Sequence, residues 1–97
     1  MENNKREFLI ALYDIYGNLL TEKQKNYFED YYFCDLSLAE IAENYEISRN
    51  GVFDQLKRVE NILEDYEDKL HYYDKIKKIE ALDDNCSKNE VLSIIKE

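Results

Sequence analysis

The chain has 97 residues, of which 44% are hydrophobic and 36% are charged, a balance that indicates one globular domain and excludes a disordered chain. Proline is absent and glycine occurs only twice, so few residues interrupt helices and an all-α fold is expected. The formal net charge of −9 argues against tight, nonspecific binding to phosphate backbones.

The first predicted helix covers residues 5–16 and ends at Gly17 and Asn18, which are typical of a helix end and a turn. Its apolar positions recur at helical spacing and are Phe8, Leu9, Leu12, Ile15 and Tyr16. Asp14 interrupts this segment and no cleavage site follows, so a signal peptide is not expected. No window approaches the roughly 18 apolar residues of a membrane span, and the cytoplasm is the expected location.

The second predicted helix lies in the run LTEKQKNYFEDYYF, where Thr21 is the expected cap and Glu22 suits the helix dipole. Its apolar stripe consists of Phe28, Tyr31 and Tyr32, with Gln24 and Tyr27 flanking it. Beyond this helix, Cys34 and Cys86 lie far apart and lack CxxC spacing, so both are expected to be free thiols.

The next two predicted helices form a helix-turn-helix motif. Ser37 and Glu40 have the spacing of a capping box, and the inward positions of this helix are Leu38, Ile41, Ala42 and Tyr45. Ser48 caps the following helix after a very short break. The small side chain of Ala42 lets the second helix cross closely, and Val52 is expected to pack against it.

The start of this second helix is the candidate recognition surface. Five positions there project into a DNA major groove, and they are Arg49, Asn50, Phe53, Asp54 and Lys57. Arginine reads guanine and asparagine reads adenine, but Asp54 has the wrong sign for a phosphate and Phe53 suits stacking or packing. Ser48 and nearby backbone N–H groups are candidates for holding a phosphate. The candidate nucleic-acid or partner-binding residues are Ser48, Arg49, Asn50, Phe53, Lys57 and Arg58.

The helical pattern continues beyond the motif, and a single long helix is expected over about residues 49–82. Its heptad-spaced apolar positions are Leu56, Val59, Leu63, Tyr66, Leu70 and Tyr73. Such a stripe pairs with another helix, so we expect a homodimer through these residues; the alternative is packing on the first helix of the same chain. Residues 1–63 then form the core. Residues 64–97 form an interaction or dimerisation extension with a short terminal helix, which Ser87 and Glu90 open.

The sequence contains no pattern typical of an enzyme. It has no Ser-His-Asp set, glycine-rich phosphate loop or metal-ligand cluster, so no catalytic residue, metal or cofactor is expected. His71 is the only histidine and is expected to be solvated on the exposed side of the long helix. The acidic run over residues 64–68 lacks the spacing and glycine of a calcium loop, and is expected to be a solvated helix face.

Two runs carry a close resemblance to the YlxM family of small bacterial helix-turn-helix proteins: LLTEKQKNYFEDYY and DLSLAEIAENYEISRNGVFDQLKRVENILEDYEDKLHYYDK, within about residues 5–75. The helix-turn-helix part also resembles region four of bacterial sigma factors. The resemblance implies an all-helical fold with a sigma-region-four-like motif and a long following helix. It also implies an accessory or regulatory role in the signal recognition particle pathway, with the particle's RNA or its GTPase as partner.

Two residues depart from the usual pattern. Glu46 stands where helix-turn-helix turns usually have glycine, and a left-handed conformation there costs about 1 kcal/mol. Gly51 stands where the family tends to have a helix former, and both changes predict a less rigid recognition helix. Three functions remain open: the pathway accessory protein, a dimeric DNA-binding transcriptional regulator, and a module that binds only protein.

Overall fold

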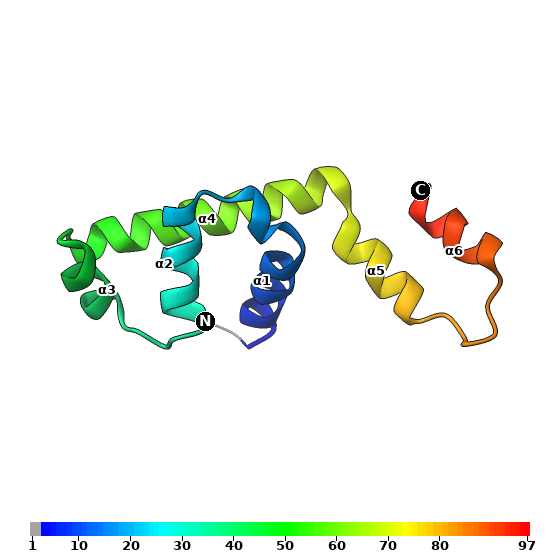
Figure 1. Ribbon diagram of the computed structural model, residues 1–97, viewed down its shortest axis with the longest axis horizontal. Helices are drawn as coiled ribbons and strands as arrows, with labels where there is room; N and C mark the ends of the chain where they lie inside the picture. Colours follow the sequence, from blue (N-terminus) through cyan, green and yellow to red (C-terminus); the bar gives the residue numbers. More distant parts are fainter. Residues whose placement is uncertain (1–2) are drawn as a thin grey trace.

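The computed structural model describes residues 3–97, which form six α-helices and one 3-10 turn with no strand in that range (Figure 1). In chain order these elements are α1 (Asn3–Tyr16), η1 (Gly17–Leu19), α2 (Glu22–Tyr32), α3 (Leu38–Tyr45), α4 (Arg49–Leu70), α5 (Tyr72–Glu80) and α6 (Lys88–Ile95). The molecule measures 53 × 22 × 19 Å. Helix α4 runs along the long axis with α1, α2 and α3 on one side, and α5 and α6 extend past its C-terminal end. The expected all-α class is confirmed.

The hydrophobic core lies between α4 and the three helices before it, in two clusters. The cluster around α1, α2 and the middle of α4 contains Leu9, Leu12, Tyr16, Leu20, Phe28, Tyr32, Val59 and Leu63. The cluster between the helices of the motif contains Tyr27, Ile41, Ala42, Val52 and Leu56. Burying one such side chain contributes about 1.5–3 kcal/mol, so α4 is held along most of its length. The predicted packing of Val52 against Ala42 is confirmed.

The predicted helix caps are confirmed. The oxygen of Ser48 accepts a hydrogen bond from the backbone N–H of Gly51 at 2.9 Å, which begins α4. Three other helices begin with complete capping boxes, formed by Thr21 with Gln24, Ser37 with Glu40, and Ser87 with Glu90. Because each cap satisfies free N–H groups of the first turn, these local signals determine where the helices start.

Helix α1 ends where the sequence predicts, but Gly17 is needed for packing and not for a left-handed backbone. It opens the 3-10 turn, and neither glycine of the chain has a positive φ. A Cβ added at Gly17 would lie 3.2 Å from the Tyr13 ring, closer than most real contacts. Glycine therefore allows the ring of Tyr13 to lie flat against the turn while it stacks on Phe28 at a centroid distance of 4.5 Å.

The prediction of one helix over residues 49–82 is wrong, because the helix is interrupted at His71. This residue has φ 58° and ψ 26°, and it separates α4 from α5. The left-handed conformation costs an ordinary residue about 1–2 kcal/mol, although histidine is among the residues enriched there. His71 is exposed as expected, but it lies at a joint and not on a continuous helix face.

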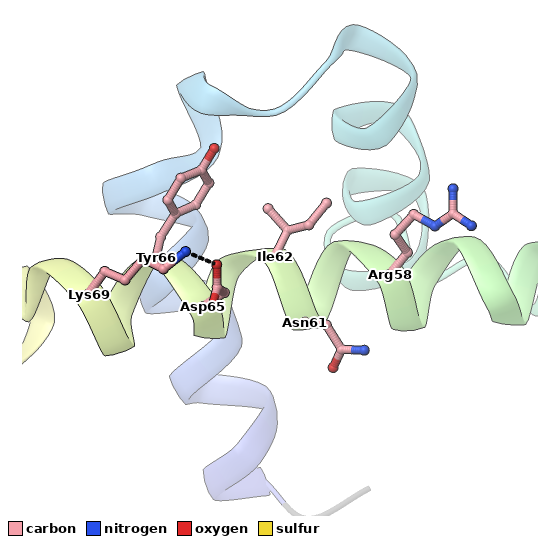
Figure 2. Close-up of a pocket in the computed structure, with 6 residues that line it drawn as sticks. All are labelled: Arg58, Asn61, Ile62, Asp65, Tyr66 and Lys69. Atoms are coloured by element: carbon pink, nitrogen blue, oxygen red, sulfur yellow. Dashed lines mark hydrogen bonds and ion pairs between the residues drawn. The ribbon is translucent and has the colours of Figure 1, made fainter.

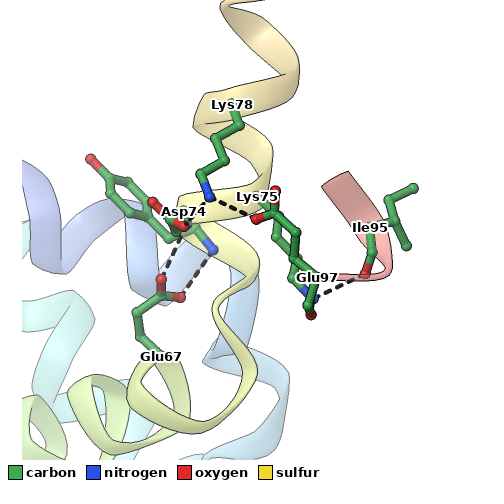
Figure 3. Close-up of polar contacts among 7 residues, drawn as sticks. Glu67, Asp74, Lys75, Lys78, Ile95 and Glu97 are labelled. Carbon is green, nitrogen blue, oxygen red and sulfur yellow. Dashed lines mark hydrogen bonds and ion pairs between the residues drawn. The ribbon is translucent and has the colours of Figure 1, made fainter. Parts of the chain in front are cut away.

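The buried carboxylate of Glu67 stabilises this joint (Figure 3). One carboxylate oxygen accepts hydrogen bonds from the Tyr16 hydroxyl at 2.7 Å and the Tyr73 N–H at 2.9 Å. The other accepts from the Asp74 N–H at 3.1 Å, while the Tyr72 N–H donates to the Tyr16 oxygen at 3.2 Å. A side chain of α4 therefore caps the first turn of α5, in the way that an N-cap residue normally does.

This role corrects the expectation that the whole acidic run is solvated. Glu67 is only 9% exposed, whereas Asp65 and Asp68 are exposed. Burial, followed by the hydrogen bond to Glu67, raises the pKa of Tyr16 to about 12. The hydroxyl of Tyr16 therefore stays protonated near neutral pH and keeps donating to the carboxylate.

Helix α6 folds back on α5 of the same chain. The ammonium of Lys75 donates to the backbone oxygens of Ile95 and Glu97 at 3.0 and 3.1 Å (Figure 3). The ammonium of Lys78 lies 2.6 Å from the Glu97 carboxylate. No residue of 72–97 is buried, so polar contacts and half-buried apolar side chains hold this hairpin together.

Candidate nucleic-acid interface

The turn between α3 and α4 sets the position of the candidate recognition helix. Glu46 has φ 56° and ψ 42°, the left-handed conformation that glycine usually adopts at this position. The N–H of Ile47 donates to the carbonyl of Ala42 at 3.0 Å and closes the end of α3. Only Ser48 then lies between Ile47 and the first residue of α4. This short connection brings Ala42 and Val52 into one buried cluster and turns the opposite side of α4 outward.

The outward side of the first turns of α4 carries the predicted binding residues. Those on its surface are Ser48, Arg49, Asn50, Phe53, Asp54, Lys57 and Arg58, all of which are exposed. Three are basic and one is acidic, so this face is locally positive although the chain is acidic overall. Local positive charge on a helix that projects from the core is suited to contacts with nucleic acid.

Lys57 is the most constrained of these cations. Its ammonium lies 3.6 Å from a carboxylate oxygen of Glu60 and 5.6 Å from the centroid of the Phe53 ring. The other oxygen of Glu60 accepts from the Tyr32 hydroxyl at 2.7 Å, in the core. Burial, with this hydrogen bond, holds the pKa of Tyr32 well above its usual range, so the hydroxyl remains a donor. Lys57 is therefore positioned by the buried Glu60 and the exposed Phe53, and its charge is partly neutralised.

Packing explains why residue 51 is a glycine, which the sequence alone did not indicate. A Cβ added there would lie 3.2 Å from the Ser48 oxygen and 3.6 Å from the Cδ1 atom of Ile47. The first of these distances is tighter than most real contacts, so a larger residue would press on the cap. Gly51 thus allows Ser48 to approach the helix and close the first turn, and it lies within α4 at a negative φ.

An open groove extends the candidate site along the outer side of α4 (Figure 2). It encloses about 790 Å³ and is lined by Arg58, Asn61, Ile62, Asp65, Tyr66 and Lys69. Asp65 and Lys69 pair across one turn at 2.9 Å, so the groove is mixed in charge. Of these residues, the sequence indicates Arg58 as a candidate binding residue and places Asp65 in the acidic run expected to be a solvated helix face.

The residues proposed for helix pairing are used mainly inside the chain. Leu56, Val59 and Leu63 are buried in the two clusters, while Tyr66 and Tyr73 pack against the first. The ring of Tyr73 contacts that of Phe8 on α1 at 5.1 Å between centroids. Of the six residues, only Leu70 is exposed, at 37%. Val59 and Leu63 therefore pack on the first helix of the same chain, as in the alternative interpretation, whereas Leu56 packs between the helices of the motif.

Other features bear on metal and membrane binding. Within residues 3–97, no three His, Cys, Asp or Glu side chains are grouped to hold a metal ion. In the same part of the chain, no helix is long and apolar enough to cross a bilayer. Cys34 is exposed and Cys86 is half-buried, and both are free thiols as expected.

Comparison with known proteins shows the family to which the chain belongs. The profile of the family described as "Putative helix-turn-helix protein, YlxM / p13 like" matches residues 3–96. A UPF0122 protein of Streptococcus mutans is 56% identical over 73 residues, which are 75% of this chain and 66% of that protein. A UPF0122 protein of Streptococcus thermophilus is 52% identical over 89 residues, which are 91% and 81% of the two chains. The chain therefore belongs to the YlxM/p13-like family of helix-turn-helix proteins.

Proposed function

We propose that this chain is a non-enzymatic accessory protein of the signal recognition particle pathway in the cytoplasm, and that it binds the particle's RNA. The observation that carries the proposal is the exposed, locally positive face at the start of α4, with Arg49, Asn50, Lys57 and Arg58. Membership of a helix-turn-helix family supports a nucleic acid as the ligand of this face. The pathway GTPase is the alternative partner within the same role.

Structured RNA suits this face better than duplex DNA does. Duplex binding depends on many phosphate contacts, and the whole chain carries a net charge of −9. Asp54 lies within the face, and Glu60 partly neutralises Lys57. Proteins recognise RNA largely through its shape and through unpaired bases that stack on aromatic side chains. The alternatives of a DNA-binding regulator and a protein-only module are therefore outcomes that the experiment must separate.

A homodimer forms part of this proposal. Because the heptad stripe is mostly buried, the contact would use its one exposed member, Leu70, and the exposed apolar side chains outside the stripe, which are Tyr72, Ile76 and Ile95. Sedimentation equilibrium of the chain and of an Ile76→Glu variant tests this. A concentration-dependent dimer that the substitution weakens is expected, and a wild-type chain that stays monomeric contradicts the dimer but not the RNA site.

Neutralising the face tests the RNA site. The Lys57→Gln/Arg58→Gln double variant should lose affinity for the particle's RNA, and the salt dependence of binding should fall by about one unit per lost phosphate contact. Glutamine is preferable to glutamate because a carboxylate at residue 57 would repel the buried Glu60. The matched control, Lys77→Gln/Lys88→Gln, removes the same charge from exposed positions on α5 and α6, away from this face.

Whether this face binds the RNA is measured by fluorescence anisotropy of labelled RNA with each of the two double variants. Equal affinity of the Lys57→Gln/Arg58→Gln variant and the control would exclude this face as the RNA site. Wild-type affinity for an unrelated DNA duplex equal to that for RNA would favour the transcriptional regulator. Absence of binding to both nucleic acids would favour a protein partner, and the GTPase would be tested next.

A further inference from the structure

A small notch lies beside the recognition face, where α2, α3 and α4 meet. It encloses about 120 Å³ and is lined by Tyr31, Leu38, Phe53, Leu56, Lys57 and Glu60. Sites for drug-sized molecules are typically about 300–1,000 Å³, so this notch has room only for a single small ring system. Phe53 is 47% exposed although it is a large apolar side chain. The fold therefore leaves an aromatic surface open next to the proposed RNA site.

The chemistry of the lining matches a nucleotide base with its phosphate. The walls are two aromatic and two aliphatic side chains, and flat aromatic surfaces stack on nucleobases regardless of their sequence. The ammonium of Lys57 lies over the Phe53 ring, 5.6 Å from its centroid, close enough to meet the phosphate of a base at this ring. The Glu60 oxygen that faces Lys57 is 3.6 Å from the ammonium, beyond hydrogen-bond distance, and so can accept a bond from an amino group.

We propose that this notch receives one unpaired base of the bound RNA, stacked on Phe53. Lys57 contacts the adjoining phosphate, and Glu60 accepts a hydrogen bond from the exocyclic amino group of the base. The proposal rests on the proposed function and names the RNA feature that the same site selects. A base inside a continuous duplex cannot leave its stack without an energetic cost, so the notch favours loops and bulges. Bases with an amino group should be preferred over uracil.

The test replaces the ring and keeps an apolar side chain. Phe53→Leu removes the stacking surface, and Phe33→Leu is a matched control because Phe33 is 48% exposed on another part of the chain. The probes are an RNA hairpin with an unpaired loop and a blunt RNA duplex with the same stem. Loss of one base–aromatic stack should weaken hairpin binding by about 5- to 100-fold. Duplex binding should be unchanged, and the control should bind both as wild type does.

A second readout reports stacking directly. The fluorescent base 2-aminopurine, placed at each loop position in turn, should be quenched at one position by the wild-type chain and by the Phe33→Leu control, but not by Phe53→Leu. If Phe53→Leu bound the hairpin and quenched the fluorescence as the wild-type chain does, the proposal that the notch binds a base would be wrong. If the Lys57→Gln/Arg58→Gln variant still lost affinity in that case, the proposed RNA site would remain. Absence of RNA binding by the wild-type chain would overturn both.

Discussion

The body of the molecule (residues 3–70, α1 to α4) and its arm (residues 72–97, α5 and α6) are built from similar amphipathic helices but are held differently. Within the part of the chain that the structure describes, all thirteen buried hydrophobic residues belong to the body. The arm depends on the Glu67 cap, the Lys75 contacts and the edge of α1. An apolar stripe therefore contributes a stable core only where enough neighbouring helices cover it.

The largest expected difference between body and arm is in core substitutions. Leu63→Ala should lower the free energy of unfolding by about 2–5 kcal/mol, because it empties a fully buried site between α1, α2 and α4. Ile76→Ala, at a position that is 43% exposed, should cost less than about 1 kcal/mol. Urea unfolding followed by circular dichroism measures both. Similar losses at the two positions would mean that the arm is part of the same core.

The joint at His71 gives the second comparison, because polar contacts connect the arm to the body there. Glu67→Gln keeps one acceptor oxygen and replaces the other with an N–H₂ donor, so either the Tyr73 or the Asp74 N–H loses its acceptor, which should cost about 1–3 kcal/mol. It should also speed hydrogen exchange at the amide that loses its acceptor. Asp68→Asn is the control, since Asp68 is exposed one residue further along α4. Equal exchange rates in the two variants would contradict the capping role of Glu67.

The smallest expected effect lies in the helix-turn-helix turn of the body. Glu46→Gly should raise the free energy of unfolding by up to about 1 kcal/mol, because glycine adopts the left-handed conformation without strain. Glu43→Gly, inside α3, should lower it by about 1 kcal/mol because glycine disfavours helix interiors. The midpoint temperatures of thermal unfolding of the two variants should therefore shift in opposite directions. A decrease for both would mean that Glu46 makes a stabilising contact of its own.

Local signals made much of the body predictable. Ser37 and Ser48 cap the predicted helices because their acceptors lie only three residues from the N–H groups that they bind. The break at His71 could not be predicted in this way. No glycine or proline marks it, and its stabilising contact joins Tyr16 to Glu67, 51 residues apart in the sequence. The residues that end the helix therefore come together only after folding.

The candidate site was also predictable only in part, where local sequence rather than tertiary packing determines it. The exposed positions at the start of α4 follow from helical periodicity, so Arg49, Asn50 and Lys57 were found from the sequence. The notch was not found, because tertiary packing brings Tyr31 and Leu38 beside Phe53 from two other helices. Periodicity also could not distinguish a stripe that packs within one chain from a stripe that pairs two chains.

The most direct test of the central claim is a fluorescence anisotropy titration of the wild-type chain at two salt concentrations. The labelled ligands are the signal recognition particle RNA and an unrelated DNA duplex of similar length. The account predicts tighter binding to the RNA, with an affinity that falls as salt rises. Equal or tighter binding to the DNA duplex, or no binding to either ligand, would contradict it.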